Sequence, residues 1–276
     1  MSDKRKRQFH SRTHAIQALE GIDLCGKTIA ITGTTSGIGN AAEEYLAKKW
    51  PLHGLILNAG VFGPTTNVTS DGFEAHFGIN HLAHFILIRE LLPVLRQSAP
   101  SRIVILSSML SRFTCVKPKS SIEKKLGLLC PEDASQWFFR LYARSKMCNM
   151  LVAFKLHRDE YANGISAYSV HPGSGVRTDL HRDFGLWSLT DFLTSPFTKD
   201  ASQGAATSVY CIAHPEVKEI SGKYWESCWD DEKNLDKEVA RDEKLQDALW
   251  KHTEELIDKW VKSKKTTDNN CETVRL

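Results

Sequence analysis

Residues 27–39, KTIAITGTTSGIG, decide the fold of this chain. The first half is a short run rich in β-branched residues, which predicts a buried strand over Lys27–Thr32. The strand runs directly into a glycine-rich turn, and the helix-forming residues that follow, Asn40–Lys49, stop before Pro51. A strand, a glycine-rich turn and a helix in this order predict a βα unit whose helix N-terminus can bind a phosphate group.

The rest of the chain alternates between strand-like and helix-like patterns. Further strands are expected at 55–57, 102–106, 165–170 and 222–225, and helices at 71–95, 134–158, 202–213 and 238–262. This alternation predicts parallel βαβ units in a doubly wound, Rossmann-like α/β sheet. Ligands bind such sheets beyond the carboxyl ends of the strands.

Composition and charge are those of one soluble globular domain. The chain has 276 residues, of which 41% are hydrophobic and 25% charged. We expect a basic extension at 1–21, a single domain at 22–262 and a polar tail at 263–276. The net charge of +3 is too small to favour a nucleic-acid partner. No transmembrane segment is expected, since the most apolar stretch, 85–95, is short and carries charges.

The cysteines and the N-terminus favour a cytoplasmic protein. The seven cysteines are odd in number and form no CxxC pair, so we expect reduced thiols in a reducing compartment. The N-terminus has no apolar signal-peptide core. The basic run 4–7 is interpreted as a solvated terminus, and a membrane-surface or nuclear-targeting patch is the alternative.

Tyr142-Ala-Arg-Ser-Lys146 places a phenol and an ammonium four residues apart, on one face of a predicted helix. A phenol titrates near pH 10, and an adjacent cation favours the phenolate. Such a tyrosine can exchange a proton with an alcohol or a carbonyl while a hydride moves. The histidines at 81, 84 and 171 lack partners at metal-ligand spacing, so we expect no metal and assign them structural roles.

These motifs together resemble the short-chain dehydrogenase/reductase family. The resemblance rests on Thr-Gly-x-x-x-Gly-x-Gly at 32–39, Asn-Ala-Gly at 58–60, Ser-Ser at 107–108, Tyr-x-x-x-Lys and Pro-Gly at 172–173. Segments such as 12–16, 144–149 and 196–199 are similar to the subgroup of WW-domain-containing oxidoreductases and retinol dehydrogenases. No tryptophan precedes Gly33, so no WW module is expected in this sequence.

The resemblance implies a set of site residues and a nicotinamide cofactor. The implied catalytic residues are Tyr142, Lys146, Ser108 and Asn80. The implied residues at the NADP or NAD site are Gly33, Thr34, Ser36, Gly37, Ile38, Gly39, Asn58, Ala59, Gly60, Tyr142, Lys146, Pro172, Gly173 and Thr178. In the family, the serine bonds the reacting oxygen and the asparagine holds a water that relays protons to the lysine. The second serine, Ser108, takes the family role, and a buried amide that bonds the backbone is the plainer interpretation of Asn80.

One departure from the family concerns the sheet. Only 22 residues separate Thr32 from Leu55, where the family inserts two more strands with their helices, roughly 70 residues. We therefore expect five strands of the usual seven, with the first strand at an exposed edge. The residue that selects between NADP and NAD belongs to the missing part, and the subgroup resemblance slightly favours NADP. A shortened splice form or an incorrect gene model is our hypothesis for this gap.

Two functions remain open at this point. The first is an oxidoreductase that transfers a hydride between a nicotinamide cofactor and an alcohol or carbonyl. The aromatic segment 183–199, at the family's lid position, suggests an apolar substrate such as a retinoid, a steroid or a lipid-derived carbonyl. The alternative is a catalytically impaired short form that acts as a binding or regulatory protein. Whether the chain forms a homo-oligomer is not decided by the sequence.

Overall fold

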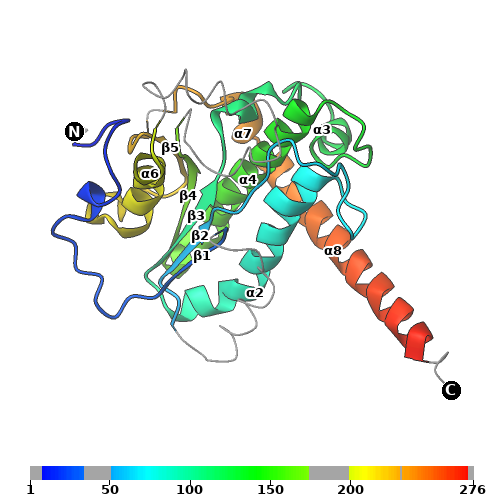
Figure 1. The fold of residues 1–276 in the computed structure, drawn as a ribbon, viewed down its shortest axis with the longest axis horizontal. Coiled ribbons are helices and arrows are strands. Elements are labelled where there is room, and N and C mark those ends of the chain that lie inside the picture. Colours follow the sequence, from blue (N-terminus) through cyan, green and yellow to red (C-terminus); the bar gives the residue numbers. More distant parts are fainter. Residues whose placement is uncertain (1–7, 34–50, 174–198, 231, 273–276) are drawn as a thin grey trace.

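Five parallel strands form the sheet at the centre of the molecule (Figure 1). The computed structural model describes residues 8–33, 51–173, 199–230 and 232–272, with backbone only from 265 onward. The strands are adjacent in chain order: β1 (Ile29–Ile31), β2 (Gly54–Leu57), β3 (Ser101–Leu106), β4 (Ile165–His171) and β5 (Lys223–Glu226). This confirms the predicted Rossmann-like α/β class and its reduced sheet.

Helices cover both faces of the sheet. The α-helices of the described residues are α2 (Ala83–Gln97), α3 (Ile122–Leu129), α4 (Phe138–Glu160), α6 (Ala201–Ala213), α7 (Lys237–Ala240) and α8 (Glu243–Glu272). The other helical segments are the π-helical η2 (Phe77–Leu82) and the 3-10 segments η1 (Gln17–Leu19), η3 (Met109–Phe113), η4 (Tyr161–Asn163) and η7 (Pro215–Val217). Helices α2 and α4 lie on one face and α6 on the other, as Figure 1 shows.

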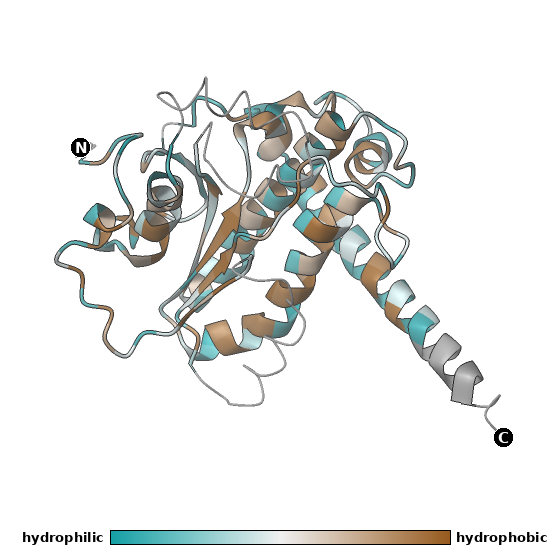
Figure 2. Cartoon of the chain, in the orientation of Figure 1, coloured by the Kyte–Doolittle hydropathy of each residue, from teal (hydrophilic) through white to brown (hydrophobic). Residues whose placement is uncertain are grey.

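Alternation along the strands divides the apolar core into two layers. Leu55 and Ile103 point into the layer shared with α2, α4 and α8, whereas Ile56 and Val104 point toward α6. Figure 2 shows the apolar residues concentrated on the strands. Strands β2, β3 and β4 are buried on both faces, as parallel strands covered by helices must be.

Strand β1 lies at the edge of the sheet, as predicted. Among the strands that the structure describes, it pairs with β2 alone, from Ile29 opposite Gly54 to Ile31 opposite Ile56. Ile31 is 47% exposed, unusual for an apolar residue in the first strand of such a sheet. The connection from β1 to β2, including the predicted helix Asn40–Lys49, falls in 34–50 and lies outside the described residues.

Three predicted helices have other boundaries in the structure. The helix predicted over 71–95 starts at Ala75, because the Glu74 carboxylate accepts from the backbone N–H groups of His76 (2.9 Å) and Phe77 (2.8 Å). Helix α4 begins at Phe138 instead of 134, after a turn in which Asp133 accepts from Ser135 N at 2.8 Å.

The last predicted helix, 238–262, is two helices. Asp242 accepts from the backbone N–H of Leu245 at 3.1 Å and starts α8 after α7 has ended at Ala240. The same carboxylate binds the Lys125 ammonium at 2.6 Å. Helix α8 then continues to Glu272, ten residues beyond its predicted end and into the segment expected to be a loose tail.

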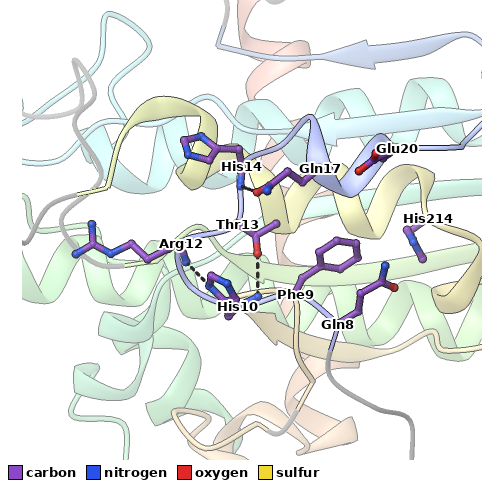
Figure 3. Close-up of a pocket in the computed structure, with 9 residues that line it drawn as sticks. All are labelled: Gln8, Phe9, His10, Arg12, Thr13, His14, Gln17, Glu20 and His214. Atoms are coloured by element: carbon purple, nitrogen blue, oxygen red, sulfur yellow. Dashed lines mark hydrogen bonds between the residues drawn. The ribbon is translucent and has the colours of Figure 1, made fainter.

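The N-terminal segment from residue 8 packs on the domain instead of extending away from it. Phe9 and Ala18 are buried in the layer beneath α6, and the Phe9 ring lies 5.3 Å from that of Tyr210. The backbone N–H of Ala15 donates to the Ser202 carbonyl oxygen at 3.1 Å. Figure 3 shows the residues that line a pocket here, which come from the segment 8–20 and from His214, the residue that follows α6. The volume of this pocket is about 470 Å³. The basic run 4–7 lies outside the described residues.

Candidate functional site

Thr32 joins the end of β1 to the loop that follows β2. Its hydroxyl oxygen accepts hydrogen bonds from the backbone N–H groups of Asn58 (2.9 Å) and Ala59 (3.0 Å). Because these donors occupy its lone pairs, the hydroxyl hydrogen is left for His84 Nε2, 3.0 Å away. Burial lowers the pKa of His84 to about 3, which agrees with a neutral, accepting Nε2.

Gly33 makes the close approach of these two strand ends sterically feasible. Its φ of +88° is a left-handed conformation, and a Cβ atom at this position would lie 2.8 Å from Ala59 Cα. The Asn58 side chain donates to the Thr32 carbonyl oxygen at 3.2 Å. The predicted Gly33 and Asn58-Ala59-Gly60 motifs therefore meet at one edge of the sheet.

Replacing Thr32 with valine is expected to destabilise the protein by about 2–4 kcal/mol, because two backbone N–H groups and a histidine nitrogen lose their partner. Urea denaturation of the purified chain measures this change. Thr65→Val is the matched control, since Thr65 is exposed. Equal stability of both variants would mean that the Thr32 hydroxyl does not hold the strand ends together.

Tyr142 and Ser108 meet at the carboxyl end of β3. Tyr142 is in the second turn of α4 and is 6% exposed, and the Ser108 hydroxyl lies close enough to its phenol to lower the pKa of that group. The Ser108 oxygen accepts from the Leu110 backbone N–H at 3.2 Å, which leaves its hydrogen free for the phenol. Ser107 instead donates to the Lys146 carbonyl oxygen at 2.7 Å. The geometry thus distinguishes the two serines, and Ser108 is the one that faces Tyr142.

Lys146 lies one helical turn beyond Tyr142 and is 4% exposed. Its ammonium nitrogen is 5.7 Å from the centre of the Tyr142 ring and donates to the Leu106 carbonyl oxygen at 3.3 Å. A Cβ atom on Gly60 would lie 3.4 Å from that nitrogen, so the loop after β2 reaches the lysine. Among the described residues, no carboxylate forms an ion pair with Lys146.

The electrostatics of the pair differ from the sequence-based expectation. Burial raises the pKa of Tyr142 to about 12, and the hydrogen bond from Ser108 opposes this only in part. The pKa of Lys146 falls to about 8, also because of burial. The ammonium of Lys146 is not among the causes that shift the pKa of the phenol, and burial is the largest cause for both groups, so the expected lowering by the ammonium is not present.

Asn80 lies within the π-helical segment η2, and its side chain is fully engaged with protein. Its Oδ1 accepts from the Val61 backbone N–H at 2.7 Å. Its Nδ2 lies 3.1 Å from the Val61 carbonyl oxygen and 3.0 Å from Ser145 Oγ. The side chain thus fixes the loop after β2 to the helices beneath it, and π-helical turns are frequent at functional sites.

Pro172 and Gly173 follow β4 at the same edge of the sheet. The Lys199 ammonium donates to the Pro172 carbonyl oxygen at 3.4 Å. A Cβ atom on Gly173 would lie 2.0 Å from the Lys199 ammonium nitrogen. The sequence did not predict the buried Lys199 as a site residue, although Lys199 belongs to the segment 196–199 that carries the family resemblance. His171, assigned a structural role, has no hydrogen-bond partner for either ring nitrogen among the described residues.

An aromatic wall stands beside Tyr142. The Phe62 ring packs edge-on against the Tyr142 ring at 4.8 Å and against the Phe138 ring at 5.4 Å. Phe139 stacks on Trp137 at 5.2 Å, and Trp137 is 61% exposed. This wall, formed by Phe62 and 137–139, was not expected from the sequence, because it joins the loop after β2 to the start of α4.

Some predicted site residues lie outside the described part of the chain. They are Thr34, Ser36, Gly37, Ile38, Gly39 and Thr178. The aromatic segment 183–198 also lies outside it. Within the described residues, no group of three or more His, Cys, Asp and Glu side chains is placed to hold a metal ion. None of the helices there combines the length and apolarity required to cross a membrane.

Known proteins resemble this chain both in sequence and in fold. The family model described as short chain dehydrogenase matches residues 41–117. WW domain-containing oxidoreductase of Gallus gallus is 33% identical over 91% of this chain and 73% of its own length. Retinol dehydrogenase 12 of Mus musculus is 37% identical over 81% of this chain and 66% of its own. The chain therefore belongs to the short-chain dehydrogenase/reductase family, a family of oxidoreductases.

A solved structure supports the fold, and the alignment lengths support the missing segment. A crystal structure of an uncharacterised protein from Mycobacterium paratuberculosis matches 87% of this chain and 96% of its own, with a TM-score of 0.56 and 22% identity. The alignment with the Gallus gallus protein spans 306 positions. It includes 91% of the 276 residues of this chain, which is about 251 residues. About 55 alignment positions therefore have no residue from this chain. This is fewer than the roughly 70 residues that the family resemblance predicts for two more strands with their helices.

Proposed function

We propose that this chain transfers a hydride between a nicotinamide cofactor and an alcohol or carbonyl substrate. The observation that carries the proposal is the arrangement of Tyr142, Ser108 and Lys146 at the carboxyl ends of β2, β3 and β4. Parallel α/β sheets bind ligands at this edge. Membership of an oxidoreductase family supports the same reaction class.

The described residues fit a nicotinamide cofactor in two respects. Gly33 and Gly60 let the strand ends pack directly against Asn58-Ala59 and against Asn80 and Lys146, which brings these motifs together at the edge of the sheet where a cofactor would bind. The Lys146 ammonium has three hydrogens, and the hydrogen bond to Leu106 uses one. Lys146 would hold the ribose hydroxyls, and Asn58-Ala59-Gly60 would line the adenosine side. The bound cofactor supplies the hydride acceptor or donor.

Tyr142 is the proton donor to a carbonyl, or the acceptor from an alcohol, in this proposal. Ser108 would bond the reacting oxygen and orient it toward the phenol. Lys146 would stabilise the phenolate once the proton has left, because a cation near a phenolate lowers the cost of its charge. Asn80 would position the loop that borders Lys146 and hold a proton-relaying water with its backbone.

The aromatic wall beside Tyr142 supports an apolar substrate, such as a retinoid, a steroid or a lipid-derived carbonyl. Phe62 and Phe138 would contact the part of the substrate next to its reacting oxygen. For the cofactor, we propose NADP or NAD, with NADP slightly favoured by the resemblance to the retinol dehydrogenase subgroup.

A catalytically impaired binding protein is the second candidate, favoured by the exposed edge of β1 and the smaller sheet. A melting experiment with cofactor separates the two. For the oxidoreductase, cofactor at about 100 times its Kd should stabilise the protein by about 2.7 kcal/mol, on the order of 5–10 °C. ATP serves as the control for non-specific nucleotide binding. An unchanged melting temperature with both NADPH and NADH would favour the binding protein.

A further inference from the structure

Two thiols and an imidazole meet on the side of α4 that faces α3 and α8. Cys130 follows the last residue of α3, Cys148 lies on α4, and His252 lies on α8. Cys148 and His252 both lie close enough to the Cys130 thiol to lower its pKa. Neither cysteine takes part in the site around Tyr142. The pair therefore requires its own explanation.

The burial of the three groups is graded from the solvent inward. His252 is only partly buried, Cys130 is 8% exposed, and Cys148 is fully buried. The Cys148 thiol also donates to the Leu129 carbonyl oxygen at 3.6 Å, which holds its sulfur next to the residue that precedes Cys130. A small polar reagent approaching past His252 would meet Cys130 first.

The charges around the pair favour one thiolate and one thiol. The neighbouring Cys148 thiol and His252 imidazole lower the pKa of Cys130 to about 7, against its burial. Burial and the neighbouring Cys130 raise the pKa of Cys148. Cys130 raises the pKa of His252 most, and the carboxylates of Glu255 and Glu132 add to this. The reactive form of a cysteine is its thiolate, so the two sulfurs have different chemical roles.

We propose that Cys130 is a peroxide-reactive thiol and that Cys148 resolves its oxidised form as an intramolecular disulfide. The Cys130 sulfur attacks hydrogen peroxide, the O–O bond breaks, and the leaving hydroxide takes the His252 proton to become water. Cys130 is oxidised by two electrons to a sulfenic acid. The Cys148 sulfur then attacks it, the S–O bond breaks, and the Cys148 proton leaves with the hydroxide as a second water.

Exposure alone would favour different cysteines. Cys25 and Cys115 are exposed, whereas Cys130 is nearly buried. Oxidation governed by access would therefore modify Cys25 and Cys115 first. Oxidation governed by thiolate character and by a neighbouring thiol would select Cys130 and Cys148. The two explanations give opposite products, which makes the proposal testable.

Hydrogen peroxide added to the purified, reduced full chain tests the proposal. After denaturation and alkylation, the reduced protein should carry seven labels, one on each cysteine, and the oxidised protein two fewer. Peptide mapping should recover one linked pair, Cys130 with Cys148. Full alkylation after peroxide treatment, or a disulfide between other cysteines, would overturn the proposal. Cys25→Ser and Cys115→Ser are the matched controls and should leave the pair unchanged.

Three variants test the separate roles. In Cys148→Ser, dimedone should trap a sulfenic acid on Cys130, whereas in Cys130→Ser, Cys148 should stay reduced. His252→Gln should slow the oxidation about tenfold at pH 7, because the thiolate fraction of Cys130 falls when its imidazole partner is lost. No dimedone adduct in Cys148→Ser would overturn the role of Cys130. Oxidation of His252→Gln at the unaltered rate would overturn the role of His252.

Discussion

Tyr142→Phe is expected to lower turnover about 100-fold or more, while the cofactor-induced shift in melting temperature persists. The hydroxyl is the only group that the substitution removes, and phenylalanine keeps the ring that packs against Phe62 at 4.8 Å. At a pKa of about 12 the Tyr142 phenol carries its proton at pH 7, which is the form that a proton donor to a carbonyl requires.

The measurement is steady-state turnover with NADPH and NADH against a panel of apolar aldehydes and ketones. Tyr161→Phe is the matched control, because Tyr161 lies just beyond the other end of α4 and is 39% exposed. It should leave turnover unchanged. Turnover of Tyr142→Phe close to that of the unsubstituted chain would remove Tyr142 from the role of acid and base.

The strands could be predicted from sequence because their patterns are local. Runs such as 27–32 and 102–106 are short, apolar and β-branched, and a buried parallel strand requires no more than that. The site motifs at the strand ends were equally accessible, since the carboxyl ends of parallel strands meet at one edge. The sequence alone therefore predicted that Gly33, Asn58 and Ser108 lie in the same region.

Features that depend on contacts between distant segments could not be predicted. One local contact was missed as well, because the Glu74 carboxylate accepts from the N–H groups of His76 and Phe77 and so sets the start of the helix predicted over 71–95. The aromatic wall joins Phe62 to residues more than 70 positions later. The pKa values of Tyr142 and Lys146 follow from burial by the whole fold, which the four-residue spacing does not contain.

Lys146→Met is expected to abolish turnover and to stabilise the free protein at pH 7 by about 2–3 kcal/mol. The pKa of Lys146 is lowered from 10.5 to about 8 by burial, and a difference of this size costs the folded state about 3 kcal/mol whenever both states are protonated. Losing the hydrogen bond to Leu106 lowers the stability of Lys146→Met by about 1 kcal/mol, so the net gain is smaller than the cost removed.

The gain in stability of Lys146→Met over the unsubstituted protein should decrease as the pH rises from 8 to 10.5. Below pH 8, the lysine is charged in both the folded and the unfolded chain, so the full cost is present. Between pH 8 and 10.5, the unfolded chain binds more protons than the folded one, and the unsubstituted protein becomes more stable relative to Lys146→Met. Denaturation curves of both proteins at pH 7 and pH 10 measure this convergence.

Lys125→Met is the matched control, because Lys125 is as buried as Lys146 but pairs with Asp242 at 2.6 Å. It should be destabilised at pH 7, since the substitution leaves a partly buried carboxylate without its partner. Equal stability of Lys146→Met and the unsubstituted chain at pH 7 would mean that the ammonium costs nothing. A buried ammonium that lowers stability and has no carboxylate partner is expected where its charge and spare hydrogens serve a bound ligand and a phenolate.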